Sequence, residues 1–144
     1  MEVTRAIAEA LQGILQNLND GAVPKANNYF DHVWIGMPEK IPMGDQNVAI
    51  IVADTDPTYT YATGPLCVGW DTDFLIFIMN KGTVTEATLT NYDITDIVKR
   101  ALLSDHKISD TCLGSTIEDV TRGPVAESLK KLVAGSQITL RCRL

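Results

Sequence analysis

The run from Phe74 to Met79 constrains the fold most, because it is apolar at every position (Phe-Leu-Ile-Phe-Ile-Met). A strand with one face in water normally alternates apolar and polar residues, so a strand here needs cover on both of its faces. The run is far too short to cross a membrane as a helix, which takes about 20 residues. We therefore expect a central strand whose second face is covered either by another layer of this chain or by a neighbouring subunit.

Two other segments have the periodicity of helices. Residues 3–18 repeat apolar residues at spacings of three and four, which predicts an amphipathic helix that ends at Asn19-Asp20-Gly21. A second helix is predicted to begin near Asn91, which would cap its first turn, and to end near Ser104 or Asp105. The predicted buried stripes are Ile7, Leu11, Ile14 and Leu18 in the first helix and Ile94, Ile97, Val98, Ala101 and Leu102 in the second.

Several short runs are rich in β-branched and aromatic residues and predict strands. These runs are His32–Ile35, Asn47–Ala53, Thr58–Ala62, Cys67–Val68 and a closing strand, Gln137–Leu144. In the closing strand, Ile138, Leu140, Cys142 and Leu144 alternate with Thr139, Arg141 and Arg143, so one face is buried. Within residues 105–136, Thr116–Thr121 has β character but is interrupted by Gly123-Pro124, and Ala126–Val133 is compatible with a short helix or a strand. The whole pattern predicts one α+β domain over residues 1–144, with a mixed, mostly antiparallel sheet flanked by two main helices.

Composition narrows the possible functions. The 144 residues are 45% hydrophobic and 21% charged, as in ordinary globular proteins, and carry a net charge of −6, which disfavours binding to nucleic-acid phosphates. The three cysteines, Cys67, Cys112 and Cys142, lack CxxC spacing and are interpreted as buried free thiols. His32 and His106 lie in unrelated contexts, and the chain contains neither GxSxG nor GxGxxG. We therefore predict no catalytic residues, no cofactor and no enzymatic activity.

Two acidic triplets, Asp54-Thr-Asp56 and Asp71-Thr-Asp73, stand at strand ends. Four converging carboxylates could bind a hard cation such as Ca²⁺ or Mg²⁺. Neither triplet continues into a glycine-containing calcium loop, and aspartates beside turns commonly accept hydrogen bonds from local backbone amides. We therefore predict no metal site and interpret Asp54, Asp56, Asp71 and Asp73 as a candidate acidic rim or lumen.

The loop from Gly36 to Asp45 contains apolar Met37, Ile41 and Met43, which would be costly to expose on a monomer. Trp34 and Trp70, with Tyr59 and Tyr61, could stack on bases, but such platforms need interleaved basic residues, and neither Lys nor Arg occurs between Lys40 and Lys81. Core or interface packing is the better interpretation of these aromatic residues.

The order of these elements resembles the tail terminator, or tail completion, proteins of long-tailed bacteriophages. The segments that carry the resemblance are His32-Val-Trp-Ile-Gly36, Ile41-Pro42, Val48-Ala-Ile-Ile-Val52, Phe74 to Met79, Tyr92 to Leu102 and Ile138 to Arg143. They span most of the chain, and residues 105–136 match least well.

This resemblance implies a structural virion protein that forms a hexameric ring, ends the tail tube and offers its other face to a neck or head-completion protein. DNA would pass through the ring without specific binding, the protein would not bind a membrane, and assembly would take place in the host cytoplasm. The candidate interface residues are Trp34, Met37, Ile41, Met43, Phe74, Ile76 and Ile78. The alternatives are another head-to-tail connector or, from a different class, a small acidic metal-binding module or enzyme.

Overall fold

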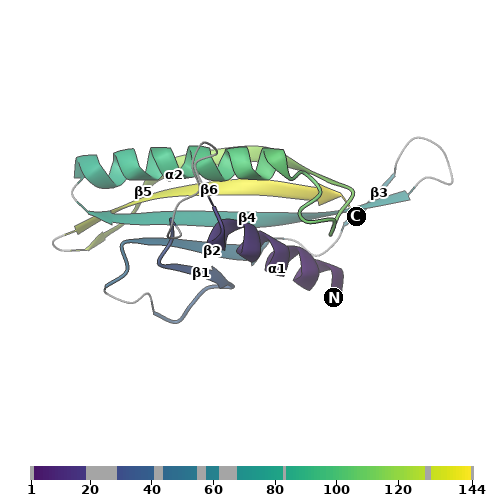
Figure 1. Cartoon of the computed structure of the whole chain (residues 1–144), viewed down its shortest axis with the longest axis horizontal. Helices are drawn as coiled ribbons and strands as arrows, with labels where there is room; N and C mark the ends of the chain where they lie inside the picture. The colour runs from purple at the N-terminus through teal and green to yellow at the C-terminus, as the bar shows by residue number, and fades with distance from the viewer. Residues whose placement is uncertain are drawn as a thin grey trace.

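The protein has two helices and a mixed sheet in the described residues, as the sequence predicts (Figure 1). This computed structural model describes residues 2–18, 29–40, 44–54, 58–61, 68–82, 84–128 and 131–143. The elements in chain order are α1 (Glu2–Gln16), β1 (His32–Ile35), β2 (Asn47–Ala53), β3 (Thr58–Tyr61), β4 (Val68–Gly82), α2 (Val84–Ser104), β5 (Gly114–Ser128) and β6 (Lys131–Arg143). The strand order is β1-β2-β4-β6-β5, with β3 paired to the first part of β4. The predicted α+β class is confirmed.

The first helix follows the predicted periodicity. Ile7, Leu11 and Leu15 are fully buried, and they lie on one side of the helix because their spacing is four residues. The regular helix ends at Gln16, where the backbone amide and the side-chain amide of Asn17 both donate to the carbonyl of Gly13. This helix therefore has one face to bury and contacts β1 and β2 with it.

The second helix is longer than predicted. It begins at Val84, so the predicted start near Asn91 is wrong. Asn91 does not cap a helix end, because its buried side chain donates to the carbonyl of Ile78 and to Oδ1 of Asn80 beneath the helix. The predicted end near Ser104 is confirmed. Glu86 in the first turn interacts favourably with the positive end of the helix dipole.

The sheet combines one parallel pair with antiparallel pairs. The bounds of β1 and β2 match the prediction, and these two strands are parallel. The sequence of Ala126–Val133 is compatible with a short helix or a strand. In the structure, the described residues of this segment are strand residues at the end of β5 and the start of β6, which form an antiparallel hairpin. Gly123 and Pro124 do not end β5, because the strand accommodates them with a register shift between Pro124 and Ala126.

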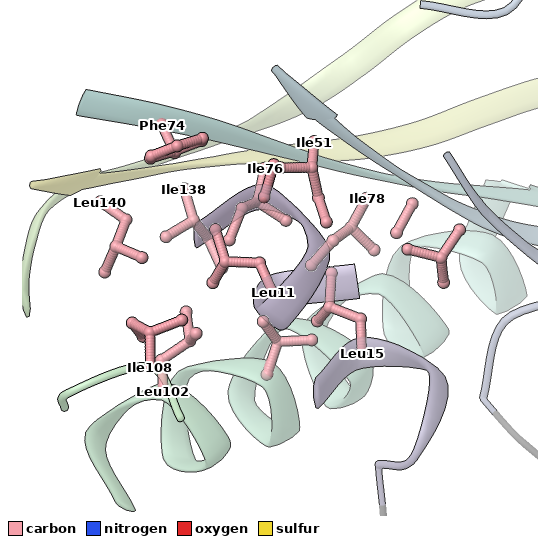
Figure 2. Packing of buried hydrophobic residues seen from close by; sticks show 14 of the residues in the cluster. Leu11, Leu15, Ile51, Phe74, Ile76, Ile78, Leu102, Ile108, Ile138 and Leu140 are labelled. Carbon is pink, nitrogen blue, oxygen red and sulfur yellow. The ribbon is translucent and has the colours of Figure 1, made fainter. Parts of the chain in front are cut away.

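Both helices pack on the same face of the sheet, and the core lies between them and the strands (Figure 2). Phe74, Ile76 and Ile78 of β4 point into this core and are fully buried. Ile51 lies opposite Ile76 on β2, and Ile138 lies opposite it on β6. The other face of the sheet therefore receives no helix from the described chain, and we call it the open face.

Candidate interaction surface on the open face

An apolar strip crosses three strands on the open face. Side chains alternate along a strand, so Leu75, Phe77 and Met79 lie on the side of β4 opposite the core. Their register partners on β2 are Val52, Ile50 and Val48, and Trp34 of β1 is the partner of Ile50. We call these residues the apolar strip: Trp34, Val48, Ile50, Val52, Leu75, Phe77 and Met79.

Exposure within the apolar strip is uneven. Val48 and Ile50 are buried, whereas Trp34, Val52 and the three β4 residues are partly exposed. The expectation that both faces of the Phe74–Met79 run are covered therefore holds fully for the helix face and only in part for the open face. Partly exposed neighbouring apolar side chains on three adjacent strands form a surface that further burial would stabilise.

Polar contacts hold the connection between β1 and β2 to the open face at one side of the strip. The ring of His32 stacks on Trp34 with centroids 5.1 Å apart, and its Nδ1 lies 2.5 Å from Oδ2 of the buried Asp45. Asp31 accepts hydrogen bonds from the backbone amides of Gln46 and Asn47, and these bonds lower the pKa of the Asp31 carboxyl. The last residues of the connection are thus fixed beside Trp34.

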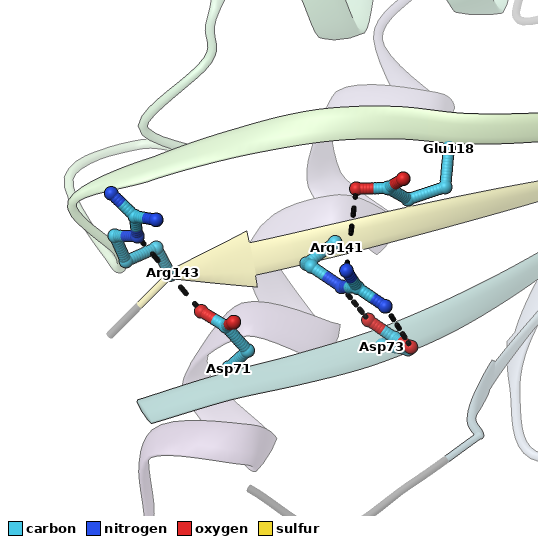
Figure 3. A network of polar contacts seen from close by, with 5 residues as sticks. All are labelled: Asp71, Asp73, Glu118, Arg141 and Arg143. Atoms are coloured by element: carbon cyan, nitrogen blue, oxygen red, sulfur yellow. Dashed lines mark hydrogen bonds and ion pairs between the residues drawn. The ribbon is translucent and has the colours of Figure 1, made fainter. Parts of the chain in front are cut away.

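An ion-pair network joins β4, β6 and β5 (Figure 3), and its Asp73 comes two residues before Leu75 of the strip on β4. Arg141 lies 3.1 Å from Asp73 and 3.7 Å from Glu118, and Arg143 lies 4.0 Å from Asp71. The hydrogen bond and charge of Asp73, with the charge of Glu118, raise the pKa of the Arg141 guanidinium. Such exposed pairs add little to stability, typically about 0–1 kcal/mol each, but they fix where charge lies on the surface.

The structure corrects part of the predicted interface. Phe74, Ile76 and Ile78 have no exposed surface, because α1 and α2 cover them, so they are core residues and cannot meet a neighbouring chain. Trp34 lies on the open face, as an interface residue could, and Met37 is 67% exposed. Ile41 and Met43 lie outside the described residues.

The predicted acidic rim is only partly free. Asp54 is exposed directly after β2, and its backbone amide donates to the carbonyl of Asp73. The side chains of Asp71 and Asp73 are paired with arginines, so their charges are largely compensated. Asp56 lies outside the described residues. Among the residues with described placement, no group of three or more His, Cys, Asp or Glu side chains is arranged to hold a metal ion.

A groove of about 430 Å³ lies on the helix side, between the start of α1 and the ends of β1 and β2. Its lining includes Ala8 and Ile35, which are apolar, and the charged Arg5 and Glu9. These two charged side chains bind each other at 2.8 Å and are exposed. The groove therefore offers apolar packing with one surface ion pair, which is not an arrangement of acid and base poised on a substrate.

Sequence reasoning missed the three β4 residues that remain accessible, Leu75, Phe77 and Met79. It predicted that the run has two faces, but every position is apolar, so nothing in the run says which face the helices take. The flanking Thr72 and Asn80, both buried on the helix face, are compatible with either choice because they are polar. No protein-family model matches the chain, and a search of curated proteins gave no match. Neither helix in the described residues is long and apolar enough to span a membrane.

Proposed function

We propose that the chain is a structural virion subunit that forms a ring, ends a bacteriophage tail tube and joins the tail to the neck. The observation that supports this proposal is the apolar strip, with Leu75, Phe77 and Met79 partly exposed on β4, the central strand of the sheet. The resemblance of the sequence segments between His32 and Arg143 to tail terminator proteins is the second support for the proposal. The proposed partners are identical subunits, a tail tube protein and a neck or head-completion protein.

The strip favours a partner for a physical reason. Burying apolar surface is worth about 25 cal/mol per Å², so a half-buried Phe77 and its neighbours gain further stabilisation when another chain covers them. In a ring of identical subunits each contact joins two different patches, because the rotation that closes the ring is not a two-fold. The strip would be one of these patches, and a different surface of the next subunit would cover it.

The charge of the chain fits a conduit for DNA. A net charge of −6 repels phosphates, and Asp54 contributes an exposed carboxylate at the end of β2. A ring lined in this way would let DNA pass without holding it. The arginine partners of Asp71 and Asp73 weigh against the alternative of a metal-binding module, since those carboxylates already have counter-charges.

The proposal is tested by the mass of the assembly and by one substitution in the strip. Native mass spectrometry of the wild-type chain is expected to show hexamers. Phe77→Lys places a charge in the middle of the strip and is expected to leave only smaller species, whereas Leu113→Lys, which changes a side chain that is 69% exposed elsewhere, is expected to keep the hexamer. Circular dichroism checks that each variant is folded.

If Phe77→Lys fails to fold, Val52→Lys near the end of β2 replaces it, because this residue belongs to the same strip and is also partly exposed. A wild-type chain that stays monomeric at all concentrations, or folded strip variants that assemble as well as Leu113→Lys, would contradict the proposal. Binding to purified tube ends separates a terminator from another neck connector, which would form a ring but leave tube ends free.

A further inference from the structure

The outer side of α2 carries residues at a repeat of seven. Leu89, Asp96 and Leu103 are spaced by seven, and so are Tyr92 and Lys99. Leu89, Tyr92 and Leu103 are 56%, 42% and 67% exposed, so three large side chains with apolar surface lie uncovered on one helix face. A seven-residue repeat keeps one stripe on one side of a helix, and this geometry is the one that helix pairs use.

Charge is distributed unevenly along the same side. Exposed Glu86 and Asp93 lie in the first half of α2, whereas Lys99 and exposed Arg100 lie in the second half. Within the described residues, no ion pair engages the side chains of Asp93, Lys99 or Arg100. The helix surface is therefore acidic at one end and basic at the other, and it complements a copy of itself only when the copy runs in the opposite direction.

We propose that two copies of the chain associate through α2, with the helices antiparallel about a two-fold axis near Asp96. In this arrangement Leu89 meets Leu103 of the second copy, and Asp93 meets Arg100 of the second copy on the same flank. Tyr92 meets Lys99 of the second copy on the other flank. Each contact occurs twice, because the interface is related by a two-fold.

The residue at the axis has a local counter-charge. Asp96 would face its own copy, but Nη2 of Arg122 on β5 lies 3.3 Å from its Oδ1. The same guanidinium lies 4.9 Å from the centroid of the Tyr92 ring. Two aspartates and two arginines therefore meet at the axis with no net charge. A parallel pair would instead bring the two acidic halves of α2 together, which is unfavourable.

This contact is separate from the proposed ring. The stripe lies on the outer side of α2 and faces away from the sheet, while the apolar strip lies on the opposite, open face of the sheet. A ring contact and an α2 contact could therefore form on the same molecule, which would pair two rings or pair free subunits. The inference goes beyond the ring proposal and does not depend on it.

Disulfide cross-linking tests the pairing and its direction. The test uses the full chain with Cys67 and Cys112 replaced by serine, the buried Cys142 retained, and mild copper-catalysed oxidation by air. The double variant Leu89→Cys/Leu103→Cys is expected to form covalent dimers on a denaturing gel. Neither single variant should link to itself, because seven residues of helix on each side of the axis separate identical positions by about 21 Å, far beyond disulfide reach.

Charge reversal tests the flanking pair in the same double-cysteine protein. Asp93→Arg and Arg100→Asp are each expected to slow cross-linking by about tenfold, since each replaces two attractive contacts with two repulsive ones. Combining them restores the attraction with its sign reversed, and the rate is expected to recover. The gel counts covalent pairs whether or not rings form, so its result is independent of the hexamer measurement.

Three outcomes would overturn the inference: a double-cysteine variant that stays uncrosslinked, single variants that link to themselves as readily as the double variant, or a combined charge reversal that stays slow. The second outcome would indicate a parallel or non-specific contact. Circular dichroism confirms that each variant remains helical.

Discussion

Replacing Ile76 with alanine tests which face of β4 belongs to the core. Ile76 has no exposed surface and packs between Ile51 and Ile138 under the two helices. Truncating a fully buried isoleucine to alanine costs roughly 2–5 kcal/mol, because transfer energy is lost and a cavity remains. Native proteins are stable by roughly 5–15 kcal/mol, so this loss is a large share of the total and is easily measured.

The neighbouring Leu75 provides a matched control. Leucine and isoleucine are isomers, so Leu75→Ala removes the same atoms from the same strand, but Leu75 points to the open face and is partly exposed. We expect Leu75→Ala to cost about 1–2 kcal/mol, less than Ile76→Ala. Urea unfolding followed by circular dichroism, at protein concentrations low enough to keep subunits apart, gives both values. Equal losses, or a larger loss for Leu75→Ala, would refute the assignment of the two faces.

Three further results are expected. Asp31→Asn should lower the free energy of unfolding by about 1 kcal/mol at pH 7. The pKa of Asp31 is lowered, so its ionised form stabilises the fold, and the difference from wild type should shrink as Asp31 becomes protonated below about pH 4. Urea midpoints measured across pH 2–7 check this, and a constant difference would contradict it. Asn80→Ala should lower the free energy of unfolding by about 2–3 kcal/mol in the same urea assay, because Asn91 and Asn47 each lose a hydrogen-bond partner. An unchanged stability would mean that this buried chain of amides does not contribute to folding. Burial raises the pKa of the Cys142 thiol, and the nearby Cys112 thiol adds a smaller effect in the same direction. Maleimide should therefore label Cys142 only after unfolding, as measured by peptide mass spectrometry, and rapid labelling of the native chain would contradict the buried placement.

Local sequence patterns predicted the elements whose burial has a regular period. The bounds of β1 and β2 and the body of α1 follow from β-rich runs and from the spacing of Ile7, Leu11 and their neighbours. The alternation in β6 likewise placed Leu140 inside and Arg141 outside. In these segments local propensity and burial agree, so the sequence is informative by itself.

The start of α2 could not be read in the same way. Asn91 follows a threonine-rich stretch and has a side chain that can cap the first turn of a helix, so the sequence pattern predicts that the helix starts there. In the structure Asn91 is a buried polar residue within α2, and its hydrogen-bond partners, Ile78 and Asn80, belong to the strand β4. Tertiary contacts of this kind leave no periodic signal along the helix itself.

The sequence predicts an apolar interaction surface that includes the Phe74–Met79 strand, but it does not identify which residues of this strand form it. Knowing that the Phe74–Met79 run has two apolar faces predicts a need for cover, yet the choice of face depends on where both helices pack. The pairing of Arg141 with Asp73 likewise depends on the register between β4 and β6, which joins residues far apart in the chain. Such long-range register cannot be derived from local patterns along the chain.

Electron microscopy of the purified chain, alone and mixed with tail tubes, tests the ring proposal most directly. We expect closed rings of six subunits in negative stain, found free and at tube ends, with the apolar strip around Phe77 covered by the next subunit. Images that show only monomers or two-fold dimers, with bare tube ends, would contradict the proposal.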